Sequence, residues 1–321
     1  MTGKNILVIG SGVSGLTSAL LLLRAGHKVN IWSKESAGEF PSTSYNAYAM
    51  WVPVKIDADP RVDLWTNESY SAFEKLSNDA ATGVEMRKII ALKPEHSEPW
   101  YATSLSIFRH ATTEELPAGY ADGHVLESAP VIDPTVYLPW LHNQVQTLGG
   151  KFEQREVEDI AKCPTDFEAI INCSGLGARQ LAADTGLFPE RMQVVRIKPN
   201  GFTDVVIDDE GHNKRSCIVP HRDYIQIGAV FDGNNETLQI DDKHTQDILE
   251  RCRRMLPGFK CDDSDVISVA RALRPERSRT RVELEKLADG RALVHNYGHD
   301  GMGYLISYGI AAEIAKYFEA L

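Results

Sequence analysis

Three glycines near the start of the chain have the spacing of a phosphate-binding turn, G-x-G-x-x-G. They follow the apolar run at residues 6–9 and precede residues 17–25, which have the composition of a helix; residues 29–32 resemble a second strand. Glycines at such a strand-to-helix turn let the backbone approach a pyrophosphate, and the helix N-terminus offers N–H groups and a positive dipole end. We therefore predict a βαβ unit that binds a dinucleotide. The expected contacts are Gly10, Gly12, Val13, Ser14 and Gly15.

The end of the second predicted strand usually supplies a carboxylate to the adenosine ribose. Here the strand ends in Ser33, Lys34 and Glu35. We expect Glu35 to bind the ribose, and Lys34 either to contact the adenosine side or to be solvated. A lysine at this place is also compatible with the phosphorylated ribose of NADP, so these residues alone do not choose between FAD and a nicotinamide.

A second glycine-rich turn lies near the other end of the chain. Gly298, Gly301 and Gly303 stand between a predicted strand at residues 293–297 and a predicted helix at residues 304–320. A flavin that accepts a hydride gathers negative charge near N1 and C2=O, and a helix N-terminus there is stabilising. A nicotinamide has no such requirement, so this turn favours FAD.

Composition restricts the class of protein. The chain has 321 residues, of which 43% are hydrophobic, and a net charge of −11. The negative charge argues against nucleic acid and against an anionic membrane surface as partners. The five cysteines are dispersed without a C-x-x-C pair, as expected for reduced thiols in a cytoplasm. We expect no signal peptide, no transmembrane segment and no C-terminal peroxisomal tripeptide. No histidine pattern predicts a metal site.

The order of predicted elements indicates an α/β (α+β overall) protein with two domains. Segments of nucleotide-binding type fall at residues 1–55, 130–190 and 265–321, and we assign them to a discontinuous Rossmann-type FAD-binding domain. Residues 56–129 and 191–264 contain alternating apolar patterns typical of an antiparallel sheet. We assign these two segments to a substrate-binding domain.

Several further motifs occur in a characteristic order: A-x-A-x-W-x-P at 47–53, N-C-S-G-L-G-A at 172–178, L-R-P at 273–275 and H-N-Y-G-H-x-G-x-G at 295–303. With these motifs the chain resembles the D-amino acid oxidase family of FAD-dependent amine oxidases over residues 5–320. The resemblance implies hydride transfer from the substrate Cα to flavin N5, then hydrolysis of the imino acid to a keto acid and ammonia. Reoxidation by O2 would give H2O2.

The resemblance also implies roles for individual residues. Arg274 would bind the substrate carboxylate, a role that suits a planar and permanently charged guanidinium, and Gly301 would line the pyrimidine end of the flavin at the catalytic centre. We expect neutral or basic D-amino acids as substrates. The implied cofactor contacts are Ser44, Ala49, Met50, Trp51, Val157, Ser174, Gly175, Gly298, Gly301, Met302, Gly303 and Tyr304.

The chain departs from the family pattern where the substrate is expected. Cys217 stands where the family usually has a tyrosine, and Asp300 replaces a small residue in the last motif. Tyr224 could compensate for Cys217 only in a shifted register, and Val54 replaces an aromatic residue. These departures leave two alternatives open: an amine oxidase or dehydrogenase for glycine, a secondary amine, a D-dicarboxylate or a biosynthetic amine, and a non-catalytic flavin-binding paralogue. A homodimer is also left open.

Overall fold

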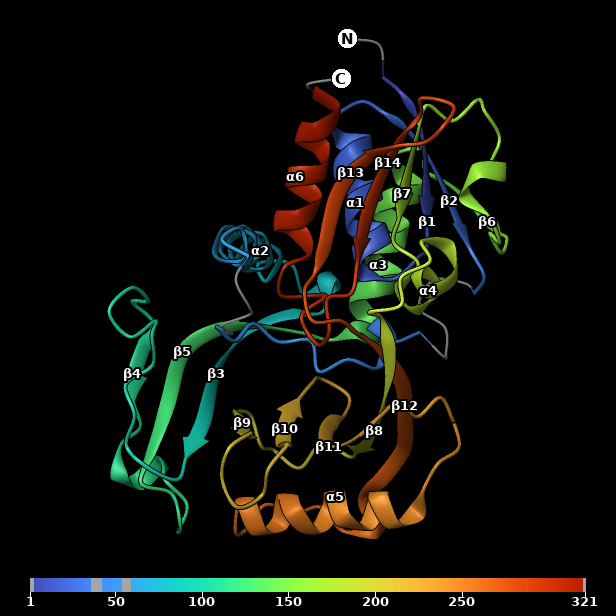
Figure 1. The fold of residues 1–321 in the computed structure, drawn as a ribbon. Helices are drawn as coiled ribbons and strands as arrows, with labels where there is room; N and C mark the ends of the chain where they lie inside the picture. Colours follow the sequence, from blue (N-terminus) through green and yellow to red (C-terminus); the bar gives the residue numbers. More distant parts are fainter. Residues whose placement is uncertain (1–2, 36–41, 54–58, 320–321) are drawn as a thin grey trace. The chain divides into compact units, whose positions relative to one another are not determined.

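The computed structural model describes residues 3–35, 42–53 and 59–319 (Figure 1). Val54, a predicted substrate contact, lies outside these residues. The chain forms two compact units. Unit 1 consists of Met1–Val84, Ile132–Glu190 and Leu273–Leu321, and unit 2 consists of Glu85–Val131 and Arg191–Ala272.

Unit 1 contains a sheet with the strand order β13-β14-β7-β1-β2-β6. Its strands are β1 (Asn5–Ile9), β2 (Lys28–Ser33), β6 (Lys151–Gln154), β7 (Ala169–Asn172), β13 (Arg281–Lys286) and β14 (Ala292–Tyr297). All neighbours are parallel except β13 and β14. In this register Asn172 pairs with both Ile9 and His295, and Ile9 also pairs with Trp32. The loops that follow β1, β2, β7 and β14 therefore leave the sheet at the same edge, where α/β proteins bind their ligands.

The helices of unit 1 are α1 (Val13–Arg24), α2 (Val62–Leu76), α3 (Pro134–Thr147), α4 (Ala178–Leu181) and α6 (Ser307–Glu319). Helix α1 packs against both α3 and α6, and α6 also packs against α2 (Figure 1). The contact between α2 and α6 is close because a Cβ at Gly309 would lie 2.1 Å from the Cα of Trp65. The Ser69 hydroxyl of α2 accepts hydrogen bonds from the backbone N–H groups of Tyr308 and Gly309.

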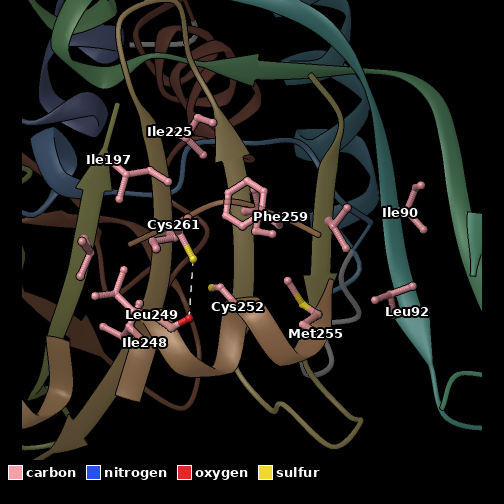
Figure 2. Close-up of a cluster of buried hydrophobic side chains, with 14 of the residues drawn as sticks. Ile90, Leu92, Ile197, Ile225, Ile248, Leu249, Cys252, Met255, Phe259 and Cys261 are labelled. Carbon is pink, nitrogen blue, oxygen red and sulfur yellow. Dashed lines mark hydrogen bonds between the residues drawn. The ribbon is translucent and has the colours of Figure 1, made fainter. Parts of the chain in front are cut away.

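Unit 2 is built on a sheet with the strand order β12-β8-β11-β10-β9-β3-β5-β4. These strands are β3 (Val84–Lys93), β4 (Phe108–His110), β5 (Asp122–Ile132), β8 (Phe188–Ile197), β9 (Val205–Asp208), β10 (Ser216–Pro220), β11 (Ile225–Gly233) and β12 (Val266–Glu276). Helix α5 (Asp242–Met255) lies across β10 and β11. Figure 2 shows the apolar core between them, to which α5 contributes Ile248, Leu249, Cys252 and Met255. This i, i+1, i+4, i+7 spacing is one face of a helix.

The predicted fold class is confirmed, with two differences of detail. The second sheet is mixed, because β3 and β9 pair in parallel. The boundary of unit 1 follows Val84, whereas we expected it after residue 55. Residues 62–76 belong to unit 1 because this helix buries Val62, Trp65 and Phe73 and packs on α6. None of the helices in the described part of the chain has the length and apolar character that crossing a membrane requires.

Candidate active site

The first glycine-rich turn leaves no room for a side chain at Gly10 or Gly15. Gly10 has a φ of +106°, and a Cβ there would lie 2.4 Å from the carbonyl oxygen of Cys173. A Cβ at Gly15 would lie only 2.0 Å from the carbonyl oxygen of Gly10. Both obstacles are backbone atoms, which cannot rotate away. The turn therefore holds the N-terminus of α1 directly against the ends of β1 and β7.

That helix end has the properties of an anion site. Gly12 is the N-cap of α1 and has no side chain with which to cap it, and the first turn of the helix holds no acidic residue. The Val13 N–H donates a hydrogen bond to the Ser44 hydroxyl at 3.1 Å. The N–H groups and the positive dipole end of α1 favour a phosphate. The glycine turn and this helix end therefore fit a dinucleotide pyrophosphate.

The residues expected on the adenosine side lie around the ends of β2 and β6. The Ser11 hydroxyl donates to the Glu35 carbonyl oxygen at 3.4 Å, which joins the end of β2 to the glycine turn. The Glu35 side chain is exposed. Lys34 pairs with Glu156 at 3.5 Å, and both side chains are more than 60% exposed. Val157 packs on the apolar cluster that includes Trp32.

Two further loops of unit 1 carry predicted cofactor contacts. Ser174 follows β7, and its hydroxyl donates to Asn172 Oδ1 at 2.6 Å. The next residue, Gly175, has a φ of +56°. In the other loop, Ala49 accepts a backbone hydrogen bond from Ile132 at 2.7 Å, and Met50 follows it. The indole N–H of Trp51 donates a hydrogen bond to the Thr66 carbonyl oxygen of α2 at 3.0 Å. The Trp51 side chain is therefore buried against α2.

The C-terminal glycine turn reaches the N-terminus of α1. A Cβ at Gly303 would lie 3.5 Å from Val13 Cγ1. The Tyr304 hydroxyl donates to the Ser44 carbonyl oxygen at 2.9 Å. Gly298 opens the turn with a φ of +72°, and α6 begins at Ser307 rather than at the predicted residue 304. The two glycine turns, which are almost 300 residues apart, thus meet at Ser44.

His299 lies inside the second turn and is buried. Its Nε2 is 2.8 Å from Asn296 Oδ1, an acceptor, so Nε2 carries the proton. Its Nδ1 has no hydrogen-bond partner among the described residues. Burial lowers the pKa of His299 to about 4, so the imidazole is neutral at physiological pH. A buried nitrogen lone pair without a partner is costly, and a bound group or water that donates to it would remove this cost.

This lowered pKa predicts a pH-dependent stability. The unfolded chain takes up a proton on His299 as the pH falls below 6.5, whereas the folded chain does not until about pH 4. The free energy of unfolding is therefore highest above pH 6.5 as far as His299 is concerned. It falls by about 3 kcal/mol in all as the pH drops from 6.5 towards 4. Denaturant unfolding of the flavin-loaded protein across this range should show a shallower pH dependence in His299→Gln. The exposed His212→Gln should leave the slope unchanged, and an equal slope in all three proteins would refute the assignment.

Arg274, the predicted carboxylate-binding residue, lies beside Gly301 of the second turn. A Cβ at Gly301 would be 2.7 Å from Arg274 Nη2. The guanidinium is surrounded by carboxylates: Nη1 is 3.0 Å from Glu190, Nη2 is 3.3 Å from Glu276, and Nη2 also contacts Asp300. We call these four residues the Arg274 cluster. All of them belong to unit 1.

The Arg274 cluster has more negative than positive charge. Burial raises the pKa of the Glu276 carboxyl, and the hydrogen bond and charge of Asp300 raise it further, against the opposite effect of Arg274. Glu276 thus retains a proton, because three carboxyl groups share a single guanidinium. The Asp300 side chain is 40% exposed, while those of Glu190 and Glu276 are below 20%. Asp300 is therefore the member that can leave Arg274 most easily.

Two members of this cluster, Glu190 and Glu276, were not predicted from the sequence. Glu276 lies two residues after Arg274 on β12, and alternate residues of a strand share a face, so this neighbour could have been found. Glu190 comes from β8, and nothing in its local sequence points to Arg274. The other nearby arginines have structural partners: Arg277 donates to Asp184 at 2.9 Å, and Arg281 donates to the Tyr297 hydroxyl at 2.6 Å.

Cys217 and Tyr224, the remaining predicted substrate contacts, belong to unit 2. Cys217 is buried in β10 between Ile207 of β9 and Gly228 of β11. Tyr224 follows the end of β10, and its buried ring lies 5.0 Å from the Arg196 guanidinium. Their part in substrate binding stays a prediction.

Comparison with known proteins identifies the class to which this fold and site belong. The family model for FAD-dependent oxidoreductases named DAO matches residues 5–317. A D-amino-acid oxidase of Dictyostelium discoideum is 32% identical over 318 residues, covering 97% of this chain and 90% of the relative. One from Rubrobacter xylanophilus is 33% identical, covering 96% of this chain and 94% of the relative. Among solved structures, a glycine oxidase from Bacillus cereus has a TM-score of 0.83 at 18% identity, covering 99% of this chain and 95% of that one.

The protein is an FAD-dependent oxidoreductase. It belongs to the DAO family, and FAD is its cofactor. The family match confirms the resemblance found in the sequence and the choice of FAD over a nicotinamide.

Proposed function

We propose that the protein oxidises D-amino acids with neutral or basic side chains to imino acids, with O2 as electron acceptor and H2O2 as product. The observation that carries this proposal is the position of Arg274 against the backbone of Gly301. A permanently charged, bidentate donor beside the glycine turn is suited to bind an amino acid through its carboxylate. Relatives that are 32% and 33% identical over almost the whole chain are named D-amino-acid oxidases, which supports the stereochemistry.

FAD, when bound, supplies the hydride acceptor and returns the electrons to O2. The residues proposed to hold it are Gly12 and Val13 at its pyrophosphate, Glu35 at its ribose, and Gly301 and Met302 at its flavin. In this proposal Arg274 binds and orients the substrate carboxylate. Fixing the substrate in this way removes orientational freedom before the reaction begins.

The chain's own carboxylates define which substrates fit. Asp300 contacts the same guanidinium nitrogen that a substrate carboxylate needs, so we propose that the substrate displaces it. The negative charge of Glu190 favours the ammonium group of an amino acid and a basic side chain, whereas Glu276 retains the shared proton and adds no second charge. A dicarboxylate would bring a second negative charge to this cluster. A human D-aspartate oxidase is also related, at 28% identity, but the charge of the Arg274 cluster argues against a dicarboxylate as substrate here.

The proposal is tested by anaerobic mixing of the flavin-loaded protein with D- and L-amino acids, glycine and N-methyl amino acids. We expect D-amino acids to bleach the visible flavin absorbance, basic and neutral ones faster than D-aspartate. Admission of air should restore the absorbance and release peroxide. Bleaching by glycine or secondary amines alone would indicate an amine oxidase or dehydrogenase for those substrates instead. No bleaching by any compound would indicate a non-catalytic flavoprotein. Bleaching that air does not reverse would exclude O2 as the acceptor.

Asp300→Asn should lower the KM for neutral D-amino acids about fivefold. Because the Asp300 side chain is 40% exposed, its pair with Arg274 contributes about 1 kcal/mol, which a substrate carboxylate no longer has to overcome. The KM for D-aspartate should fall more steeply, since one like charge is removed. Steady-state kinetics measure both values.

Asp289→Asn is a matched control, because Asp289 is also 40% exposed and pairs with another arginine, Arg291, at 2.7 Å. Its KM values should equal those of the wild type. A KM that rises in Asp300→Asn would instead show that Asp300 attracts the substrate amine.

All five cysteines are buried and none of them forms a disulfide, which supports a reducing compartment such as the cytoplasm as the place of action.

A further inference from the structure

Unit 2 contains a group of histidines that the proposed oxidation does not use. His96 follows β3, His110 ends β4, and Asp122 begins β5. The ligand atoms of these three residues all lie within 4.8 Å of one another. We propose that they bind one transition-metal ion of the Zn²⁺ class. Two imidazoles and a carboxylate are ligands that Zn²⁺ accepts, with the fourth tetrahedral position left to water.

The directions of the side chains support a metal. His96 Nδ1 lies 2.9 Å from Asp122 Oδ2, and His110 Nδ1 lies 2.9 Å from Asp122 Oδ1. Two imidazoles therefore face one carboxylate through the same type of nitrogen. Tetrahedral bonds of about 2.0 Å place ligand atoms about 3.3 Å apart, so only a small outward movement is needed to admit the ion. His96 can supply this movement, because its side chain is 72% exposed.

The second nitrogen of His110 gives independent support. His110 Nε2 lies 3.0 Å from Glu98 Oε2, so both nitrogens of this ring face carboxylates. A neutral imidazole has one N–H and can satisfy one of them. If Nε2–H donates to Glu98, the lone pair of Nδ1 points at the Asp122 carboxylate, and either a second proton on the ring or a metal ion must lie between them; we propose the metal ion. A carboxylate on the far nitrogen is the usual second-shell partner of a metal-binding histidine.

The carboxylate itself is held in place before any ion binds. The Asp122 side chain is 4% exposed and accepts hydrogen bonds from the backbone N–H groups of Gly123, at 2.7 Å, and Ser97, at 3.2 Å. The neighbouring His124 is not part of the ligand set, because its Nε2 lies 2.7 Å from the Ser97 carbonyl oxygen. The site therefore combines one fixed, buried ligand with two histidines that open to solvent.

These three residues do not form a short motif, so their sequence pattern predicts no metal site. They meet only because β4 and β5 pair antiparallel, which sets His110 opposite His124 and near the start of β5. The segment that carries His96 is then attached to Asp122 through the Ser97 N–H.

The test is calorimetric titration of the flavin-loaded, chelator-treated protein with Zn²⁺ at neutral pH, where histidine ligands are largely deprotonated. We expect one saturable site of micromolar affinity. His96→Ala should weaken it at least tenfold, and Glu98→Gln about tenfold, as is typical for loss of a second-shell partner. Because the His96 side chain is mostly exposed, its removal should not disturb folding. Co²⁺ in place of Zn²⁺ should give the visible absorption bands of a four-coordinate site.

His212→Ala is the matched control, because it removes another exposed histidine of unit 2. Its Zn²⁺ affinity should equal that of the wild type. Binding weaker than millimolar in the wild type, or equal affinity in wild type and His96→Ala, would overturn the proposal. The three residues would then form only a hydrogen-bonded cluster of protonated histidines around Asp122. Amino acid oxidation is not the readout, so this test is independent of the proposed function.

Discussion

Arg274→Ala should lower kcat/KM for the preferred amino acid about 10³-fold, while the protein still binds FAD. Truncating one partner of a buried, hydrogen-bonded charge pair costs about 4 kcal/mol, which corresponds to this factor. The loss has two causes. The substrate carboxylate loses its guanidinium, and Glu190, Glu276 and Asp300 are left without the cation that offsets their charge.

Arg274→Lys should recover part of this loss, because it keeps the charge but not the bidentate geometry. Arg281→Ala is a matched control: the Arg281 side chain is also 17% exposed and also pairs with several acidic residues, including Glu283 and Glu285. Its kcat/KM per bound flavin should stay close to the wild-type value. Arg274 would not be the carboxylate-binding residue if Arg274→Ala were reduced by amino acids as readily as the wild type.

Gly15→Ala should abolish stable FAD binding. The added Cβ would lie 2.0 Å from the Gly10 carbonyl oxygen and 3.4 Å from the Cys173 Cβ, so α1 would have to move away from the sheet edge. Overpacking of this kind costs about 1–3 kcal/mol in a tolerant core and more against rigid backbone. It would also displace the N–H groups of α1 from the pyrophosphate. We expect purified protein with little flavin and at least a hundredfold weaker FAD binding in titrations, or about 3 kcal/mol.

Gly233→Ala provides the comparison, because a Cβ there would meet no described atom within 4 Å. This variant should bind FAD like the wild type. Circular dichroism of Gly15→Ala distinguishes a lost cofactor from a lost fold. Normal flavin content in Gly15→Ala would show that the turn tolerates a side chain at this position.

The local parts of the protein could be predicted from the sequence because short-range chemistry determines them. A glycine pattern between an apolar run and a helix specifies the turn, since only residues without a Cβ fit where Gly10 and Gly15 meet backbone. The L-R-P and H-N-Y-G-H motifs predicted that Arg274 and Gly301 belong to one site, and the structure brings them into contact. The choice of FAD and of the α/β fold also followed from such motifs and their order.

Other features depend on strand pairing between distant segments, and the sequence did not show them. Glu190 reaches Arg274 because β8 lies next to β12 in the sheet, and helix 62–76 joins unit 1 because its buried face packs on α6. His96, His110 and Asp122 likewise meet through the pairing of β4 with β5. The amino-acid sequence by itself therefore determined the cofactor and the cation expected to bind the substrate. Only the tertiary structure decided which charges surround that cation, because electrostatic interactions depend on distances in space that residue spacing does not encode.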